Sequence, residues 1–268
     1  MLSTTVRPPA LAGTFYPRDA GALRAQVAEL LAAADERGGA LPKVVIAPHA
    51  ALIYSGPIAA SAFRAIAAAS QVRRVVVIGP SHRFPFYGVA LPSAAAFATP
   101  LGTLDVDPQL AADLRGVACV QVEDRAHDLE HSLEIELPFL QYLLGEFQLV
   151  PLVVGRSSAE EVAEVLARVW GGPETLVVVS SDLSHFLPYE VARRVDRTTA
   201  EAVLALRGPL ATNQACGAWA INGLLPLVRR YGLMPELLDL RNSGDTAGDH
   251  SQVVGYGAFA FRPAEASS

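Results

Sequence analysis

Runs of β-branched residues that end in a polar turn with a histidine occur three times along the chain. The runs at residues 43–46, 74–78 and 175–179 are followed by His49, His82 and His185, respectively. Continuous Val and Ile runs of this kind are typical of strands buried on both faces of a parallel sheet. The ligand crevice of such a sheet lies beyond the carboxyl ends of its strands. The pattern therefore predicts that three of the six histidines face one rim.

The rest of the chain alternates between the periodicities of helices and strands. Helices are expected at residues 20–35, 56–69, 107–114, 133–147, 158–169, 189–206 and 213–231. Strands are expected at residues 43–48, 74–79, 88–91, 101–106, 117–122, 148–154, 175–179, 236–241 and 253–261. We find no internal repeat and no long linker. The alternation predicts a single α/β domain over residues 1–268, with a largely parallel or mixed sheet flanked by helices.

The composition narrows the class of protein. The 268 residues are 51 % hydrophobic and 18 % charged, with a net charge of −6 and no basic run, so neither nucleic acid nor a membrane surface is the expected partner. No stretch reaches the ~18–20 apolar residues of a membrane span. Residues 1–9 lack the apolar core of a signal peptide. Two cysteines make no disulfide framework, and we expect a cytoplasmic protein.

The first two rim histidines are candidate metal ligands. His49 follows one buried strand, and His82 occupies the equivalent turn of the next strand along the chain. Neighbouring parallel strands lie ~4.8 Å apart, and imidazole nitrogens bind Zn, Fe or Cu at roughly 2.0–2.2 Å. A shared metal ion is therefore favoured over a purely structural hydrogen-bonding role.

Two further histidines, His127 and His131, stand four residues apart. On a helix they would share one face, as metal ligands at positions i and i+4 do. Alternatively, Ser132 and Glu134 mark the start of a helix. Glu130 and His131 would then lie at its mouth, where Glu130 could orient an imidazole or accept a proton. The sequence leaves both interpretations open.

Asp182 and His185 form the third rim group. Their spacing permits a carboxylate–imidazole pair, which would fix the tautomer of the ring. Equally, Asp182 and Ser184 could cap the start of a helix. His250 lies in a glycine-rich loop and is expected at the surface.

Cys216 is the more interesting of the two thiols. Asn213 can cap a helix that begins at Gln214, which would place Cys216 in the first turn, where the helix dipole lowers the pKa of a thiol. A thiolate there is either a nucleophile or a soft metal ligand, and Gly217 beside it would let a substrate approach. The alternative is a small buried hydrophobe, which is how we interpret Cys119.

Several segments together resemble the Memo family, whose bacterial and archaeal members are called AmmeMemoRadiSam system protein B. The matching segments follow one another along nearly the whole chain: residues 11–17, 47–50, 54–56, 79–83, 98–102, 126–134, 180–185, 216–217 and 253–256. The resemblance implies a single α/β domain similar in fold to class III extradiol dioxygenases, which are non-haem iron enzymes.

The resemblance also implies a set of site residues. These are the metal ligands His49, His82 and Cys216, with iron or copper as the metal, and the pocket residues His131, Asp182 and His185. Two departures matter. A thiolate stands where a ring-cleaving dioxygenase has a carboxylate ligand, so ring cleavage is not implied. Ala51 and Leu52 stand where Memo proteins commonly carry Gly-Tyr, which removes a phenol from the expected pocket edge.

The sequence supports three hypotheses about function. The leading one is an Fe(II)- or copper-dependent oxidoreductase of unknown substrate, in which His131, His185 and Asp182 act as acid and base groups. The second is a cysteine hydrolase with Cys216 as nucleophile. The third is a non-catalytic protein whose pocket binds a small molecule or peptide and which works with a radical SAM protein and its companion. The alanine-rich helices could support a homodimer.

Overall fold

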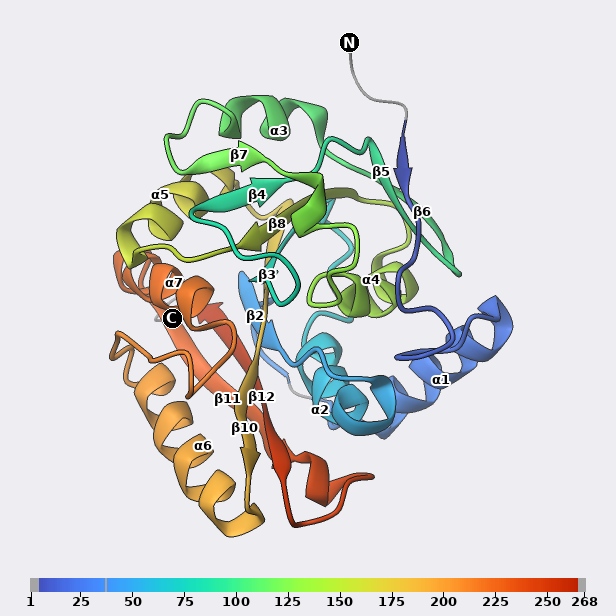
Figure 1. Ribbon diagram of the computed structural model, residues 1–268, viewed down its shortest axis with the longest axis vertical. Helices are drawn as coiled ribbons and strands as arrows, with labels where there is room; N and C mark the ends of the chain where they lie inside the picture. Colours follow the sequence, from blue (N-terminus) through green and yellow to red (C-terminus); the bar gives the residue numbers. More distant parts are fainter. Residues whose placement is uncertain (1–4, 37, 265–268) are drawn as a thin grey trace.

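The centre of the computed structural model is a sheet built on the Val and Ile runs (Figure 1). Its parallel strands are, in spatial order, β2 (Val44–Ala47), β9 (Thr175–Ser180), β3 (Arg74–Pro80) and β8 (Gln148–Val154). The structure describes residues 5–36 and 38–264. The ends of the expected 1–268 domain and part of the 1–9 segment lie outside the described residues.

Antiparallel partners extend the parallel core on both sides, so the sheet is mixed. On one side β12 (Val253–Pro263) pairs with β2, and both β10 (Asp182–Leu187) and β11 (Leu233–Asn242) pair with β12. On the other side β4 (Val89–Leu91) pairs with β8, and β7 (Val120–Val122) pairs with β4. A small sheet is formed by β1 (Val6–Arg7), β5 (Ala96–Thr99) and β6 (Gly102–Asp105).

Helices cover both faces of the large sheet (Figure 1). One face packs against α1 (Ala20–Ala33), α2 (Leu52–Arg64) and α4 (Leu137–Leu144), and the other against α5 (Ala159–Val169), α6 (Tyr189–Leu204) and α7 (Ala218–Arg230). Successive side chains of a strand alternate between the two layers: Val45 packs on the first and Ile46 on the second. This arrangement confirms the predicted α/β class and explains why the central strands are apolar throughout.

The order of the strands corrects one expectation about the site. β2 and β3 are joined by α2, but they are not neighbours, because β9 lies between them. The turns that follow β2 and β3 are therefore two strand spacings apart, or roughly 10 Å. Side chains from these two turns must reach inward over the end of β9 to meet.

Several helix boundaries differ from prediction, for local reasons. α2 begins at Leu52 rather than at 56 and includes Pro57 in its second turn. The helix expected over 133–147 is instead a short 3₁₀ helix, η2 (Glu134–Glu136), followed by α4, whose first turn contains Pro138. Proline is well suited to the first turn of a helix because its missing N–H needs no partner there.

The segment after β9 was not expected to be a strand. Asp182 pairs with Tyr256 in the β10–β12 ladder, so the interpretation of Asp182 and Ser184 as helix caps is wrong. The strands β1 and β5 were also not predicted. η1 (Asp124–Ala126), η3 (Ser243–Asp245) and α3 (Pro108–Leu114) complete the elements of the described residues.

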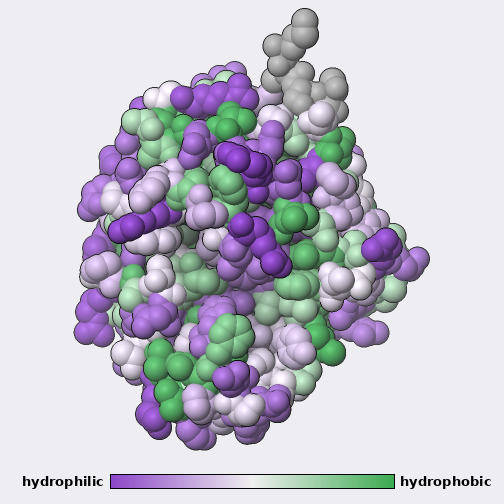
Figure 2. Space-filling view, viewed as in Figure 1, coloured by the Kyte–Doolittle hydropathy of each residue, from purple (hydrophilic) through white to green (hydrophobic). Residues whose placement is uncertain are grey.

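Hydrophilic and hydrophobic residues are interspersed over the face shown in Figure 2. Among the helices of the described residues, none is both long enough and apolar enough to cross a membrane.

Candidate metal centre

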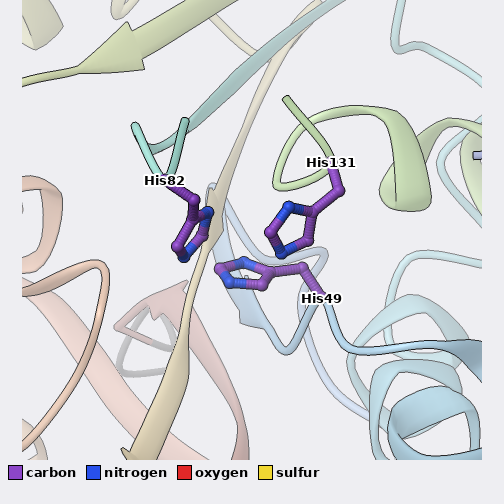
Figure 3. Close-up of side chains that lie close together, drawn as sticks. All are labelled: His49, His82 and His131. Carbon is purple, nitrogen blue, oxygen red and sulfur yellow. The ribbon is translucent and has the colours of Figure 1, made fainter. Parts of the chain in front are cut away.

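Three imidazoles converge at the carboxyl end of β9 (Figure 3). His49 follows β2, His82 follows β3, and His131 precedes η2. One nitrogen from each ring lies within 4.8 Å of the other two, and the ring centroids are 4.3–5.3 Å apart. Within residues 5–36 and 38–264, this trio is the cluster whose side-chain geometry could hold a metal ion.

In two of the rings, Nδ1 contacts another group of the protein. Nδ1 of His82 lies 2.8 Å from Oε1 of Glu130, and Nδ1 of His49 lies 2.7 Å from Oγ of Ser180. Nδ1 of His131 is 3.2 Å from the same Glu130 oxygen, but outside hydrogen-bond geometry, and it is a buried atom without a hydrogen-bond partner. Partners on Nδ1 leave Nε2 of His49 and His82 as the donor atoms, and such partners also orient a metal-binding ring.

Glu130 is the acid that organises this side of the centre. It accepts the backbone N–H groups of His82, His131 and Ser132 at 2.6–3.0 Å. Burial acts to raise the pKa of Glu130, but hydrogen bonds from His82 and these amides outweigh it and lower the pKa to about 2. Glu130 is therefore an ionised carboxylate. Its predicted role in orienting an imidazole agrees with its contact to His82.

Two histidines of the centre, His49 and His131, are held in the neutral form. Burial lowers the pKa of His49 well below its usual value, and a positive charge on His82 or His131 would lower it further. Burial and His82 lower the pKa of His131 to about 4, and burial also lowers the pKa of His185. Neutral imidazole has the free lone pair that a metal ion needs. The donor set therefore fits a first-row transition metal such as iron, copper or zinc.

Asp182 lies beside His49 but does not pair with His185. Its Oδ1 accepts the backbone N–H of His49 at 2.8 Å, whereas Nδ1 of His185 contacts the carbonyl of Leu183 at 2.9 Å. The expected carboxylate–imidazole pair is therefore wrong. Burial raises the pKa of Asp182 to about 7, against the opposing hydrogen bonds from the His49 and Ala50 backbone. A carboxyl group with such a pKa can gain or lose a proton near neutral pH.

Cys216 touches the centre from the opposite side. Its Sγ lies 3.2 Å from Nε2 of His49 and accepts the backbone N–H of Asp182 at 3.2 Å. The ligand-atom trio contains His131 rather than Cys216. The assignment of Cys216 as a ligand stays a prediction, and the sulfur contacts Nε2 of His49.

The environment of Cys216 differs from the predicted one. α7 begins at Ala218, with Gly217 as N-cap, so Cys216 precedes the helix instead of lying in its first turn. The amide of Cys216 donates to the carbonyl of Asp182, which draws this segment onto the end of β9. Burial, followed by the charge of Asp182, raises the pKa of the thiol. A Cβ on Gly217 would lie 2.6 Å from that of Ser181, so this glycine serves close packing rather than substrate access.

His127 and His250 lie outside the trio. The backbone between His127 and His131 is not helical, so the shared helix face was wrong. His127 is buried, and its Nε2 lies 3.1 Å from the carbonyl of Ala90. His250 is exposed and stacks on Tyr189, as expected for a surface residue. Leu52, expected at the pocket edge, is instead 2 % exposed within the core beside α1.

The N-terminal segment fastens the loop that holds Glu130 and His131. Nε and Nη2 of Arg7 donate to the carbonyls of His127 and Glu130 at 2.8 and 2.7 Å. Nη1 of Arg7 forms an ion pair with Glu134 at 2.5 Å. Glu134 is also contacted by three other donors of this segment: the amides of Ala10 and Leu11 and the hydroxyl of Tyr16.

Sequence reasoning missed the polar layer beneath the histidines. It consists of Ser132, Glu136 and Ser180, all of them buried. A signal was present, because Ser180 ends an apolar run and Glu136 is an acid between Ile135 and Leu137. Glu136 stands three residues after Leu133 and four before Leu140, so it lies on the apolar face of the expected amphipathic helix. In the structure all three residues of η2, Glu134, Ile135 and Glu136, are buried.

These features define an α/β protein with a candidate three-histidine metal centre at the carboxyl end of its central sheet. The family model for Memo-like protein matches residues 7–260. A MEMO1 family protein of Methanopyrus kandleri is 35 % identical over 280 residues, covering 96 % of this chain and 99 % of the relative. A second, from Methanothermobacter thermautotrophicus, is 35 % identical over 273 residues, covering 94 % and 98 %. The chain belongs to the Memo family.

A solved structure shares the fold. The crystal structure of an uncharacterised protein from Escherichia coli K12 superposes with a TM-score of 0.51 at 15 % sequence identity, covering 80 % of this chain and 98 % of that one. The resemblance inferred from the sequence is thus confirmed for the family and for the fold. The expected partners, the homodimer and the identity of the metal stay predictions.

Proposed function

We propose that this protein binds one iron or copper ion on His49, His82 and His131 and acts as a non-haem, metal-dependent oxidoreductase. The observation that supports the proposal is the convergence of three imidazole nitrogens within 4.8 Å of one another. Burial, which lowers the pKa of His49 and His131 and so keeps both rings neutral, and the orienting carboxylate of Glu130 support it further. When bound, such an ion supplies redox chemistry and coordination positions that the protein leaves open.

The residues around the trio suit proton transfer. Asp182 has a pKa raised by burial to about 7 and lies against His49, so it can take up a proton at neutral pH. His185 lies close enough that its charge would lower the pKa of His49. In this proposal Asp182 and His185 hold or move protons of the substrate. The substrate itself is a small molecule or peptide.

The test is metal content in matched variants. The protein is purified under nitrogen without chelator or nickel resin, and its metals are measured by mass spectrometry. We expect about one iron or copper ion per chain in the wild type and its loss in His131→Ala. His250→Ala, which removes the exposed histidine, is the control and should keep the metal. A metal-free wild-type protein would contradict the proposal.

Cys216→Ser decides the role of the thiol in the same experiment. Loss of metal in this variant would make the sulfur a ligand, as the sequence predicts. Retention of metal would restrict the ligands to the three imidazoles. Either way, the contact between Sγ and Nε2 of His49 at 3.2 Å is what the variant probes.

That contact also favours a second candidate function, a cysteine hydrolase in which His49 is the base for Cys216. Its weak point is the thiol, whose pKa burial raises. The candidate requires that iodoacetamide alkylates Cys216 below neutral pH faster than Cys119, without metal. We expect the opposite order, because burial raises the pKa of the Cys216 thiol further than that of the Cys119 thiol.

A further inference from the structure

Ser180, the last residue of β9, carries a hydroxyl that contacts three polar groups at once. Its Oγ lies 2.5 Å from the carbonyl oxygen of Ser132, 2.8 Å from Oε1 of Glu136 and 2.7 Å from Nδ1 of His49. All four residues are at most 1 % exposed. These groups must therefore satisfy one another's hydrogen-bonding capacity.

The chemistry of a hydroxyl allows one complete assignment. A serine hydroxyl has one proton to donate and two lone pairs to accept with. The carbonyl of Ser132 can only accept, so it takes the proton of Ser180. The two lone pairs then face Glu136 and His49, which must both donate. Every contact is satisfied when Oε1 of Glu136 and Nδ1 of His49 each carry a proton.

The other assignments leave a contact without a proton. If Ser180 donated to an ionised Glu136, or to Nδ1 of His49, its oxygen would face the Ser132 carbonyl at 2.5 Å with no hydrogen between them. An unsatisfied buried group costs about 1–3 kcal/mol. The distances therefore favour the assignment in which Glu136 is a neutral, protonated acid.

The surroundings of Glu136 agree with this assignment. Among the ion pairs formed within residues 5–36 and 38–264, none includes Glu136. Burial raises the pKa of Glu136 well above its usual value, and the negative charge of Asp182 adds to the effect, against the hydrogen bond with Ser180. A buried carboxyl group without a cation is more stable as the acid.

We propose that Glu136 is a neutral acid that donates to Ser180, and that Ser180 is a positioning residue of the metal centre, whose oxygen accepts from Nδ1 of His49 and thereby fixes the tautomer with its proton on that atom. The lone pair of His49 is then on Nε2, the atom that faces Sγ of Cys216 and is left to bind metal. The proposal rests on the proposed function for the metal. The hydrogen-bond order itself is a property of the protein alone and can be measured without any metal.

The tautomer of His49 is the first measurement. The full chain is labelled with nitrogen-15 at histidine, stripped of metal and studied by long-range proton–nitrogen NMR, with a His49→Gln variant to assign the signal. We expect a proton on Nδ1 in the wild type and in Glu136→Gln, whose amide can donate in place of the acid. Glu136→Met leaves the Ser132 carbonyl to take the Ser180 proton and should also keep the proton on Nδ1, whereas Ser180→Ala removes the acceptor of Nδ1 and should give a mixture of tautomers. A proton on Nε2 in the wild type would overturn the proposal.

Infrared spectroscopy tests the protonation of Glu136 directly. The difference spectrum between wild type and Glu136→Gln should contain the C=O band of a protonated carboxyl group. The matched control is Glu134→Gln, two residues away, where the acid is paired with Arg7 and carboxylate bands should be lost instead. Carboxylate bands in the Glu136 difference spectrum would overturn the proposal.

Cobalt(II) titration separates this proposal from the proposed function. We expect Ser180→Ala to bind Co²⁺ about 10-fold more weakly than wild type, and Glu136→Gln to stay within about 3-fold. If Ser180→Ala does not fold, Ser180→Cys, whose thiol is a weak acceptor, tests the same link. Wild-type affinity in the Ser180 variant, with an unchanged tautomer, would refute the positioning role and leave the metal centre intact. A wild type with the expected tautomer but no Co²⁺ binding would refute the metal centre alone.

Discussion

Glu134 and Glu136 belong to the same 3₁₀ helix and are equally buried, yet the protein treats them in opposite ways. Glu134 faces the N-terminal segment and is paired with Arg7 at 2.5 Å. Glu136 faces β9 and meets a single hydroxyl, that of Ser180. A buried carboxylate is tolerated when a cation and hydrogen bonds replace the lost water, and a buried acid without them keeps its proton. Although they are only two residues apart, Glu134 is a charged group that holds the N-terminal segment, and Glu136 is a neutral acid next to the metal centre.

The two acids also stabilise different neighbours. The Glu134 side holds the N-terminal segment against the loop that carries Glu130 and His131. The Glu136 side holds His49 over the end of β9 through Ser180. The comparison therefore predicts that a substitution on the Glu134 side lowers the stability of the fold. A substitution of Ser180, on the Glu136 side, should instead change the tautomer of His49.

The largest effect is expected from Arg7→Met, which leaves Glu134 as a buried charge without its cation. Breaking one partner of a buried ion pair costs about 3–5 kcal/mol in the free energy of unfolding. Urea denaturation followed by circular dichroism measures it. Arg193→Met, which removes an exposed pair with Glu190, is the control and should cost about 1 kcal/mol or less. Equal losses in the two variants would mean that the buried Arg7 pair stabilises the fold no more than the exposed Arg193 pair does.

A second prediction concerns Glu130, which contacts two histidines of the trio. Glu130→Gln should weaken Co²⁺ binding by about 10–100-fold, because the carboxylate orients the His82 ring. The loss should exceed that of Glu136→Gln, which keeps a neutral donor. Isothermal titration calorimetry on both variants gives the order, and a reversed order would contradict the different roles assigned to these acids.

The stability of Glu130→Gln relative to wild type should depend on pH. The reason is the pKa of Glu130, which lies near 2 in the folded protein and is higher in the unfolded chain. A lowered pKa contributes stability above the unfolded value of about 4.3, and this contribution is lost as the pH falls toward 2. The Glu130→Gln variant lacks this contribution to stability. The difference in unfolding free energy between wild type and variant should therefore shrink between pH 5 and pH 2, roughly the range that separates the two pKa values.

The sequence predicted the fold and the rim of the site better than the layer beneath them. The Val and Ile runs before His49 and His82 specified buried strands, because every position of such a strand is apolar. Asp182 and Cys216 were singled out from the residues alone, and the family resemblance added the prediction that they belong to one site. The position of β9 between β2 and β3 was not legible, since strand order depends on packing between distant segments.

The polar contacts of the site were equally hard to predict. Glu136 and Ser180 are 44 residues apart in the chain, and nothing local indicates that they meet. Cys216 precedes α7, which begins at Ala218, and its amide donates to the carbonyl of Asp182, which is again a long-range contact. Glu130 was the exception, because it stands beside His131 in the sequence and its role could be proposed from that neighbourhood.

The effect most specific to the comparison is the pH dependence of Glu136→Gln. The pKa of Glu136 is raised in the folded protein, so the unfolded chain releases this proton first as the pH rises. Between the unfolded pKa, about 4.3, and the folded one, wild type loses up to about 1.4 kcal/mol of stability per pH unit relative to the variant. Near pH 4 the two proteins should differ by only about 1 kcal/mol or less, since the amide replaces one neutral donor by another.

Urea denaturation of wild type and Glu136→Gln from pH 4 to pH 8 measures this difference. Asp182, whose pKa is also raised, is present in both proteins, so its contribution cancels to first order. Glu134→Gln supplies the contrast: it loses the ion pair with Arg7 and should be less stable than wild type at pH 7. If Glu136→Gln instead lost stability relative to wild type as the pH rose, Glu136 would be a carboxylate like Glu134. The two acids would then differ only in what they touch.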